Sequence, residues 1–99
     1  MKTVVVLVEA AEDIESARTF YDGSEAGVGA RFVDSLVADL VSLARLSGVH
    51  PVHFGFHRML ASRFPFGIYY REQRNETQVA AILDLRRDPS WIRAELQKR

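Results

Sequence analysis

GARFVDSLVADLVSLARL, residues 29–46, is the stretch that decides the fold class of this chain. Its apolar side chains form two neighbouring rows at helical spacing: Phe32, Leu36, Leu40 and Leu43 in one, and Val33, Val37, Val41 and Ala44 in the other. So wide an apolar stripe, with Asp34 and Asp39 on the other side, predicts an amphipathic helix packed on a core. Ser47 and Gly48 then give a stop, because glycine suits the left-handed position after a helix.

Upstream of this helix the sequence predicts a strand and a second helix. Residues 3–8, TVVVLV, are β-branched and continuously apolar, which is typical of a buried strand. Residues 10–21, AAEDIESARTFY, carry apolar side chains at helical spacing and acids in the first turn, where the helix dipole favours them. The loop at 22–29 is short, so we expect the two helices to form an antiparallel hairpin.

Downstream, after an irregular connector at 49–56, three strands are expected at 57–64, 67–72 and 77–85. Consecutive strands joined by short turns favour an antiparallel meander, which the N-terminal strand can join. The predicted fold is therefore α+β in the order β-α-α-β-β-β. The helical hairpin should cover one face of the sheet and leave the other face free for a partner.

The last predicted element is a short C-terminal helix. Asp88-Pro89 breaks the final strand and can start a helix, since proline suits the first helical position. Trp91 and Leu96 are its expected anchors on the body of the domain. With 99 residues the chain is expected to form one domain, residues 1–99.

Composition excludes several classes of protein. There is no cysteine, so there is no disulfide framework, thiolate nucleophile or cysteine-ligated metal. The longest apolar run, Val4–Val8, is too short to span a bilayer, and no clear signal peptide is present, so we expect a cytoplasmic protein without a membrane partner. No cofactor and no metal are expected.

Net charge is distributed unevenly along the chain. Residues 1–50 carry four basic and eight acidic side chains, whereas residues 51–99 carry nine basic and five acidic ones. Eleven of the 13 basic residues are arginine, which binds phosphate and carboxylate groups in a two-pronged manner. The basic second half fits a nucleic acid or an acidic peptide as partner; an arginine-rich codon usage explains the same composition without any partner.

Two further groups of residues were candidates for chemistry. His50, His53 and His57 have a spacing that resembles a metal site, but the intervening Pro51 and Gly55 disfavour a helix and no acid completes the set. We interpret them as loop histidines bonded to backbone, with a general base as the alternative. Of the strand pair Tyr69 and Tyr70, one should face the core and the other the free face, as a half-buried aromatic or, in a nuclease, as a platform for a stacked base.

Four phrases in order resemble the ParE/RelE superfamily of toxins from bacterial toxin–antitoxin pairs. They are EAAEDIESARTFY, GVGARFVDSLVADLVSLARL, HRMLASRFPFGIYYRE and LDLRRDPSWI, and together they cover nearly the whole chain. One departure is Asp84-Leu85, where the family often has His-Gly or His-x before the terminal arginine pair. The resemblance implies a plasmid-stabilisation type of toxin that a cognate antitoxin neutralises.

Within the superfamily, RelE-like members cleave messenger RNA on the ribosome, whereas ParE-like members bind DNA gyrase. Of the nuclease positions that the resemblance implies, Arg58 and Arg87 are basic here, but Leu60 and Gly67 replace two others and the C-terminal tyrosine has no counterpart. Arginine keeps its proton at physiological pH and is a poor general base. This favours the ParE-like, non-enzymatic branch, with a metal-independent ribonuclease and an inactive homologue that only binds partners as the alternatives.

The expected binding surface is an arginine rim on the free face of the sheet. Its residues are Arg58, Arg63, Arg71, Arg86, Arg87 and Trp91. Either nucleic acid or an acidic antitoxin segment that folds on binding would fit it. Two targets fit these residues, gyrase and ribosome-bound messenger RNA. Both a monomer and a homo-oligomer fit them as well.

Overall fold

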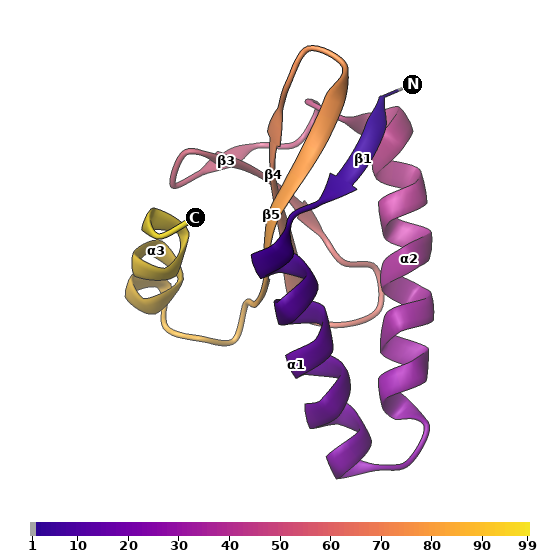
Figure 1. Cartoon of the computed structure of the whole chain (residues 1–99). Helices are drawn as coiled ribbons and strands as arrows, with labels where there is room; N and C mark the ends of the chain where they lie inside the picture. The colour runs from indigo at the N-terminus through magenta and orange to yellow at the C-terminus, as the bar shows by residue number, and fades with distance from the viewer. Residues whose placement is uncertain (1) are drawn as a thin grey trace.

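A computed structural model describes residues 2–99 of the chain (Figure 1). Its elements are β1 (Thr3–Val6), α1 (Val8–Ser24), α2 (Val28–Leu46), β2 (Val52–His53), β3 (Phe56–Leu60), β4 (Phe66–Glu72), β5 (Glu76–Asp84) and α3 (Pro89–Gln97). The strands form one sheet in the order β1-β5-β4-β3-β2, in which β1 is parallel to β5 and the other pairs are antiparallel. The predicted α+β fold, with its helical hairpin and meander, is confirmed.

The helical hairpin covers the first face of the sheet, as expected. Phe32, Leu36 and Leu43 of α2 pack with Ile68 and Tyr70 of β4 in the larger hydrophobic cluster. α1 and α2 approach closely at Gly29, because a Cβ atom there would lie only 2.5 Å from the carbonyl oxygen of Arg18. The Gly29 N–H also donates a hydrogen bond of 2.8 Å to Asp22 Oδ1, which closes the hairpin.

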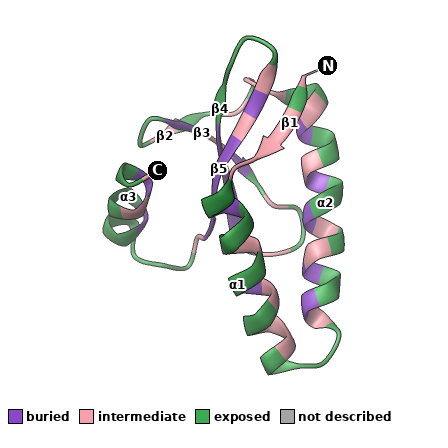
Figure 2. Ribbon diagram, in the orientation of Figure 1, coloured by how far each residue is buried: buried purple, intermediate pink, exposed green. Residues whose placement is uncertain are grey.

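The second face of the sheet is not free, and here the sequence-based expectation was wrong. Helix α3 folds back onto it, and its Ile92 and Leu96 are buried in a second cluster with Tyr69 and Leu83 (Figures 1 and 2). The reason is that the central strands carry a group of apolar side chains on this side as well, so the sheet needs cover on both faces.

A bulge in β5 prepares the second face for α3. Tyr69 pairs with Ala81 and Tyr70 pairs with Val79, so Ala80 is an extra residue between the two pairs. Ala80 and Ala81 consequently both belong to the cluster under α3. Both tyrosines are fully buried, one on each face: the predicted alternation is right, but the second face is covered, so neither ring is exposed for stacking.

Three other expectations need correction. Asp39 is buried, because its Oδ2 accepts a 3.0 Å hydrogen bond from the Ser62 N–H in the β3–β4 connection. Val37 and Val41 are exposed, because the core contacts the first apolar row of α2 and, in the second row, Val33 near the start of the helix. Ile92, not Trp91, anchors α3: Ile92 is 5% exposed and Trp91 37% exposed.

Candidate functional site

The turn between β5 and α3 is built by two aspartates. Asp84 accepts hydrogen bonds from the Arg86 backbone N–H (2.9 Å) and from its guanidinium Nε (3.0 Å) and Nη2 (2.7 Å). Asp88 caps α3 by accepting from the Ser90 N–H (2.8 Å) and the Ser90 hydroxyl (2.6 Å). The guanidinium of Arg86 lowers the pKa of Asp84, and the hydroxyl of Ser90 lowers the pKa of Asp88.

The two arginines at this turn have different environments. Arg86 is held by Asp84, and this pair is exposed on the arginine side. Arg87 points toward α3, where its guanidinium carbon lies 3.8 Å from the centre of the Trp91 ring. A cation over an aromatic face contributes about 0.5–1 kcal/mol at exposed sites. Arg87 and Trp91 therefore form one flat, partly apolar and positively charged surface.

Next to this stacked pair, α1 and α3 border a groove of about 270 Å³. It is lined by Asp13, Ser16, Ala17 and Phe20 of α1, by Phe66, Ile82, Leu83 and Asp84 of the sheet, and by Arg87 and Trp91. Phe20 is 61% exposed, so the groove has aromatic side chains on both of its walls. We call this feature the α1–α3 groove.

Phe20 is the residue of this groove that the sequence analysis missed. It lies one position before Tyr21, which packs in the core. It therefore falls outside the row Ile14, Ala17 and Tyr21, whose helical spacing predicts the helix at 10–21. A large aromatic residue off that row was the available signal, because an exposed aromatic side chain often marks an interaction surface.

A largely covered ion pair between Arg99 and Asp13 supports the groove. Arg99 donates to both carboxylate oxygens of Asp13, at 2.8 and 3.0 Å, and to the carbonyl oxygen of Ala80 at 2.9 Å. Asp13 also accepts from the Ile82 N–H at 2.9 Å. The hydrogen bond to Asp13 raises the pKa of Arg99. This Arg99–Asp13 pair ties α1, β5 and the end of α3 together.

The second face beneath α3 carries two of the predicted site arginines. The guanidinium carbon of Arg71 lies 4.3 Å from the centre of the buried Phe56 ring. Arg58 pairs across the strands with Tyr69, and its Nε is buried with no hydrogen-bond partner within residues 2–99. Burial raises the pKa of Tyr69, while the neighbouring Arg58 opposes that rise.

Leu60 and Gly67 stand opposite each other on the same two strands. A Cβ atom at Gly67 would lie 2.8 Å from the Tyr69 ring, so glycine allows that ring to lie flat on the sheet. Leu60 is 59% exposed at the end of β3. These two positions, where the resemblance implies basic residues in nucleases, are thus occupied by an apolar side chain and by an aromatic ring packed over glycine.

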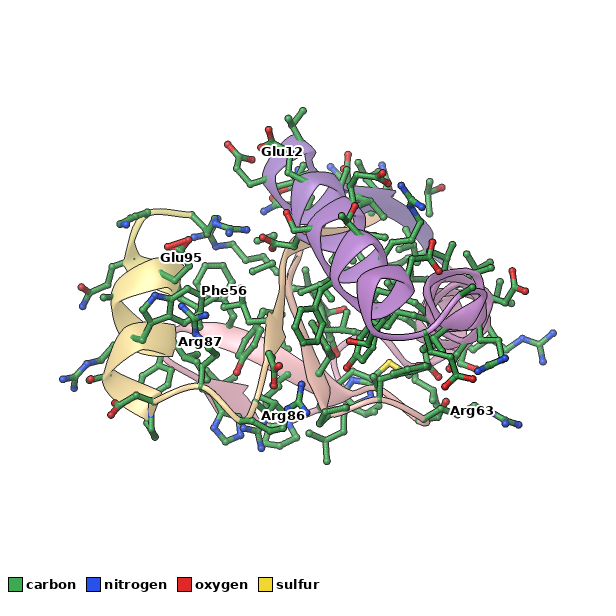
Figure 3. The ribbon with its side chains drawn as sticks, turned by 90° about the horizontal axis from the view of Figure 1, so that it is seen from below. Glu12, Phe56, Arg63, Arg86, Arg87 and Glu95 are labelled. Carbon is green, nitrogen blue, oxygen red and sulfur yellow. The ribbon has the colours of Figure 1, made fainter. Side chains whose placement is uncertain are left out.

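The predicted arginine rim is divided among separate places. Arg63 lines a different hollow with Arg31 of α2, on the side of the molecule away from α3, while Arg86 and Arg87 lie at the start of α3 (Figure 3). The structure therefore brings Arg87 together with Trp91, and Arg58 with Arg71 on one face, but it does not bring Arg63 to them.

Two of the three histidines, His50 and His57, form part of a structural network at the other end of the sheet, and His53 is the last residue of β2. The Tyr70 hydroxyl oxygen accepts from the Gly48 N–H at 2.9 Å and lies 2.6 Å from Nδ1 of His50. The His57 ring stacks on Tyr70, and its Nδ1 lies 2.7 Å from the carbonyl oxygen of His50. Burial, with a smaller contribution from His57, lowers the pKa of His50. Over residues 2–99 no three histidine or acidic side chains gather as metal ligands would.

Comparison with known proteins supports the fold. A chain of a solved structure titled "Chromosomal ParDE TA system from P. aeruginosa" superimposes with a TM-score of 0.75. The two chains are 20% identical, and the match covers 83% of this chain and 94% of the other. No protein-family model matches this sequence, and no curated protein matches it significantly. Among the described residues, no helix is both long and apolar enough to cross a bilayer.

Proposed function

We propose that this protein is the toxin of a type II toxin–antitoxin system and that it acts in the ParE-like manner, by binding DNA gyrase. The observation that carries the proposal is the likeness in fold, over 83% of this chain and 94% of the other, to a chain of a ParDE toxin–antitoxin structure. The order of the four sequence phrases supports the same assignment independently of the coordinates. The protein would act in the cytoplasm.

The second face of the sheet favours binding over catalysis. A metal-free ribonuclease must remove a proton from a 2′-hydroxyl, stabilise a charged phosphate and protonate the leaving oxygen. Here that face is packed under Ile92 and Leu96 of α3, and its tyrosine, Tyr69, is 1% exposed. A buried tyrosine with a raised pKa has no path to a substrate proton.

We further propose that the antitoxin contacts the α1–α3 groove. The groove offers aromatic side chains on opposite walls, Phe20 and Trp91, with Arg87 stacked on the latter. Aromatic and arginine side chains contribute most of the binding energy in protein interfaces. An antitoxin segment with apolar residues for the walls and an acid for Arg87 would fit.

The alternative function is a ribosome-dependent endoribonuclease that uses Arg58 and Arg87. One observation favours it: Arg58 Nε is buried without a partner among the described residues, which is a costly arrangement unless another molecule completes it. An inactive homologue that only binds partners is the third possibility, and it predicts no growth defect on expression.

Two assays separate these functions. Purified protein is added to a gyrase supercoiling reaction and, in parallel, to a translation extract in which messenger RNA integrity is followed. The ParE-like proposal predicts loss of supercoiling with intact messenger RNA. Normal supercoiling at a large excess of protein contradicts this proposal. Cleavage of messenger RNA by the wild-type protein, but not by the Arg87→Ala variant, would support the nuclease.

A further inference from the structure

The outer surface of α2 carries a row of side chains that the fold does not use. The row consists of Asp34, Val37, Ala38, Val41 and Arg45, and all five are exposed. We call it the outer row. Val37 is 52% and Val41 67% exposed, so two β-branched apolar side chains face solvent in the middle of a 19-residue helix. Figure 2 shows exposed positions along the side of α2 that faces away from the sheet.

Four residues of the outer row, Asp34, Ala38, Val41 and Arg45, lie opposite the core, and Val37 lies between them and the core stripe. The residues of α2 that contact the core, Phe32, Leu36 and Leu43, are separated from Val41 by about half a turn of the helix at 100° per residue. Val41 is therefore not an edge of the core stripe, whereas Val37 is, because it lies about 40° from Val33, which packs against the core. The outer row is a second apolar stripe on the same helix, and it has no partner within residues 2–99.

The two ends of the outer row carry opposite charges. Asp34 stands at one end and Arg45 at the other, 11 residues or about 16 Å apart along the axis. Neither side chain is part of an ion pair or of a side-chain hydrogen bond in the described structure, residues 2–99. Both charges are therefore available to another molecule.

The order of residues in the outer row is self-complementary. In two antiparallel helices related by a twofold axis, each residue faces the residue at an equal distance on the other side of the axis. The midpoint between residues 34 and 45 is the same as the midpoint between residues 38 and 41. An axis at that level pairs Asp34 of each copy with Arg45 of the other copy, which gives two charge pairs. It also places Val41 of each copy over the small Ala38 of the other.

We propose that a second copy of this chain binds at the outer row, so that the protein forms a twofold dimer through antiparallel α2 helices. The groove between β1 and α2, of about 360 Å³, adds apolar surface beside the row, since Val4, Val6 and Leu40 line it with both valines. β1 is the first strand of the sheet order and so leaves this edge of the sheet open to the groove.

The dimer is expected to be weak and reversible, because one pair of short helical stripes buries less surface than a standard interface. Its symmetry gives it specificity, since a shift of one helical turn would separate both charge pairs at once. The dimer does not depend on the proposed toxin activity, and it uses a surface separate from the α1–α3 groove.

Sedimentation velocity over roughly 5–500 µM, a range that suits weak protein interfaces, tests the proposal. The wild-type protein should shift from monomer to dimer. Asp34→Arg alone and Arg45→Asp alone should each weaken the dimer by roughly tenfold or more, because each reversal turns two attractive contacts into two repulsive ones. The double variant Asp34→Arg/Arg45→Asp should restore the dimer, because it only exchanges the charges.

A matched control carries the same exchange of charges elsewhere. Glu12→Arg/Arg93→Asp alters exposed residues of α1 and α3 and should leave the dimer unchanged. Val41→Glu, which places two carboxylates near the axis, should give a monomer with an unchanged circular dichroism spectrum. A wild-type protein that stays monomeric at every concentration overturns the proposal, and so does a dimer that the double variant fails to restore after the single variants have weakened it.

Discussion

Replacement of Arg99 by alanine is the sharpest test of how the second face is covered. The Arg99 side chain is 9% exposed and its partner Asp13 is 16% exposed, so this ion pair is largely removed from water. The loss of one partner from a buried ion pair costs about 3–5 kcal/mol, because the other charge remains unpaired. Asp13 keeps the hydrogen bond from the Ile82 N–H, which reduces that penalty.

We therefore expect Arg99→Ala to lower the free energy of unfolding by about 2–4 kcal/mol, a large fraction of the roughly 5–15 kcal/mol that a domain usually has. Arg99→Lys should lie between alanine and wild type, since an ammonium group cannot donate two parallel bonds to Asp13. Urea denaturation followed by circular dichroism measures both variants. Trp91 is the only tryptophan, so its fluorescence reports α3 separately.

Lys98→Ala is the matched control for this experiment. Lys98 is the neighbouring residue, 75% exposed, and its one ion pair is a 3.5 Å contact with Glu95. Such an exposed pair contributes about 0–1 kcal/mol. If Arg99→Ala destabilises the protein no more than Lys98→Ala does, the Arg99–Asp13 pair does not hold α3 in place and the reasoning is refuted.

The remaining predictions concern three other places in the fold. Gly29→Ala should lower the free energy of unfolding by about 1–3 kcal/mol in urea melts, because the added methyl meets the carbonyl oxygen of Arg18; an unchanged midpoint would show that the helices can separate without cost. Phe54→Asn should raise the free energy of unfolding by about 1 kcal/mol in the same urea melts, since Phe54 has a φ of 54° in a two-residue turn. Asparagine tolerates this left-handed conformation better than phenylalanine, and a destabilised variant would contradict the reasoning. His50 should titrate below its ordinary value of 6.5 in an NMR experiment, because burial disfavours the imidazolium ion. The contribution of neutral His50 to the free energy of unfolding should be complete above about pH 6.5 and should be lost as the pH falls through the lower pKa of the folded state. A pKa of His50 at or above 6.5 in the folded protein would refute the sheltered environment beside Tyr70.

Apart from the two-residue strand β2, which lies in the predicted irregular connector, the sequence was sufficient for the elements and their order, because they depend on local patterns. Helical spacing identified α2, and a β-branched run identified β1, since side-chain periodicity follows directly from backbone geometry. The left-handed Gly48 after α2 was also predicted from residue type alone, and its φ of 93° confirms it.

Tertiary packing was less predictable because it depends on residues far apart in the chain. Asp39 is buried only because Ser62, 23 positions later, brings a backbone N–H to it. The role of Arg99 could not be predicted either, because its partner Asp13 lies 86 positions earlier and only the fold brings the two side chains together. The docking of α3 follows from such contacts, which explains why the sequence suggested an open face where the structure has a covered one.

The candidate site was predicted in part for the same reason. Arg87 and Trp91 were both predicted site residues, and they are four positions apart, so the short turn into α3 is enough to bring them together. Phe20 joins them only through the relative placement of α1 and α3, and Arg63 was grouped with them only because an open sheet face was assumed.

Direct binding to purified DNA gyrase tests the central claim that the protein acts on this target. Immobilised gyrase is titrated with the protein, and the Lys98→Ala variant serves as a folded control with an unaltered groove. The account predicts saturable binding of both proteins at concentrations that stop supercoiling. No binding at those concentrations, with the protein folded by circular dichroism, would contradict it.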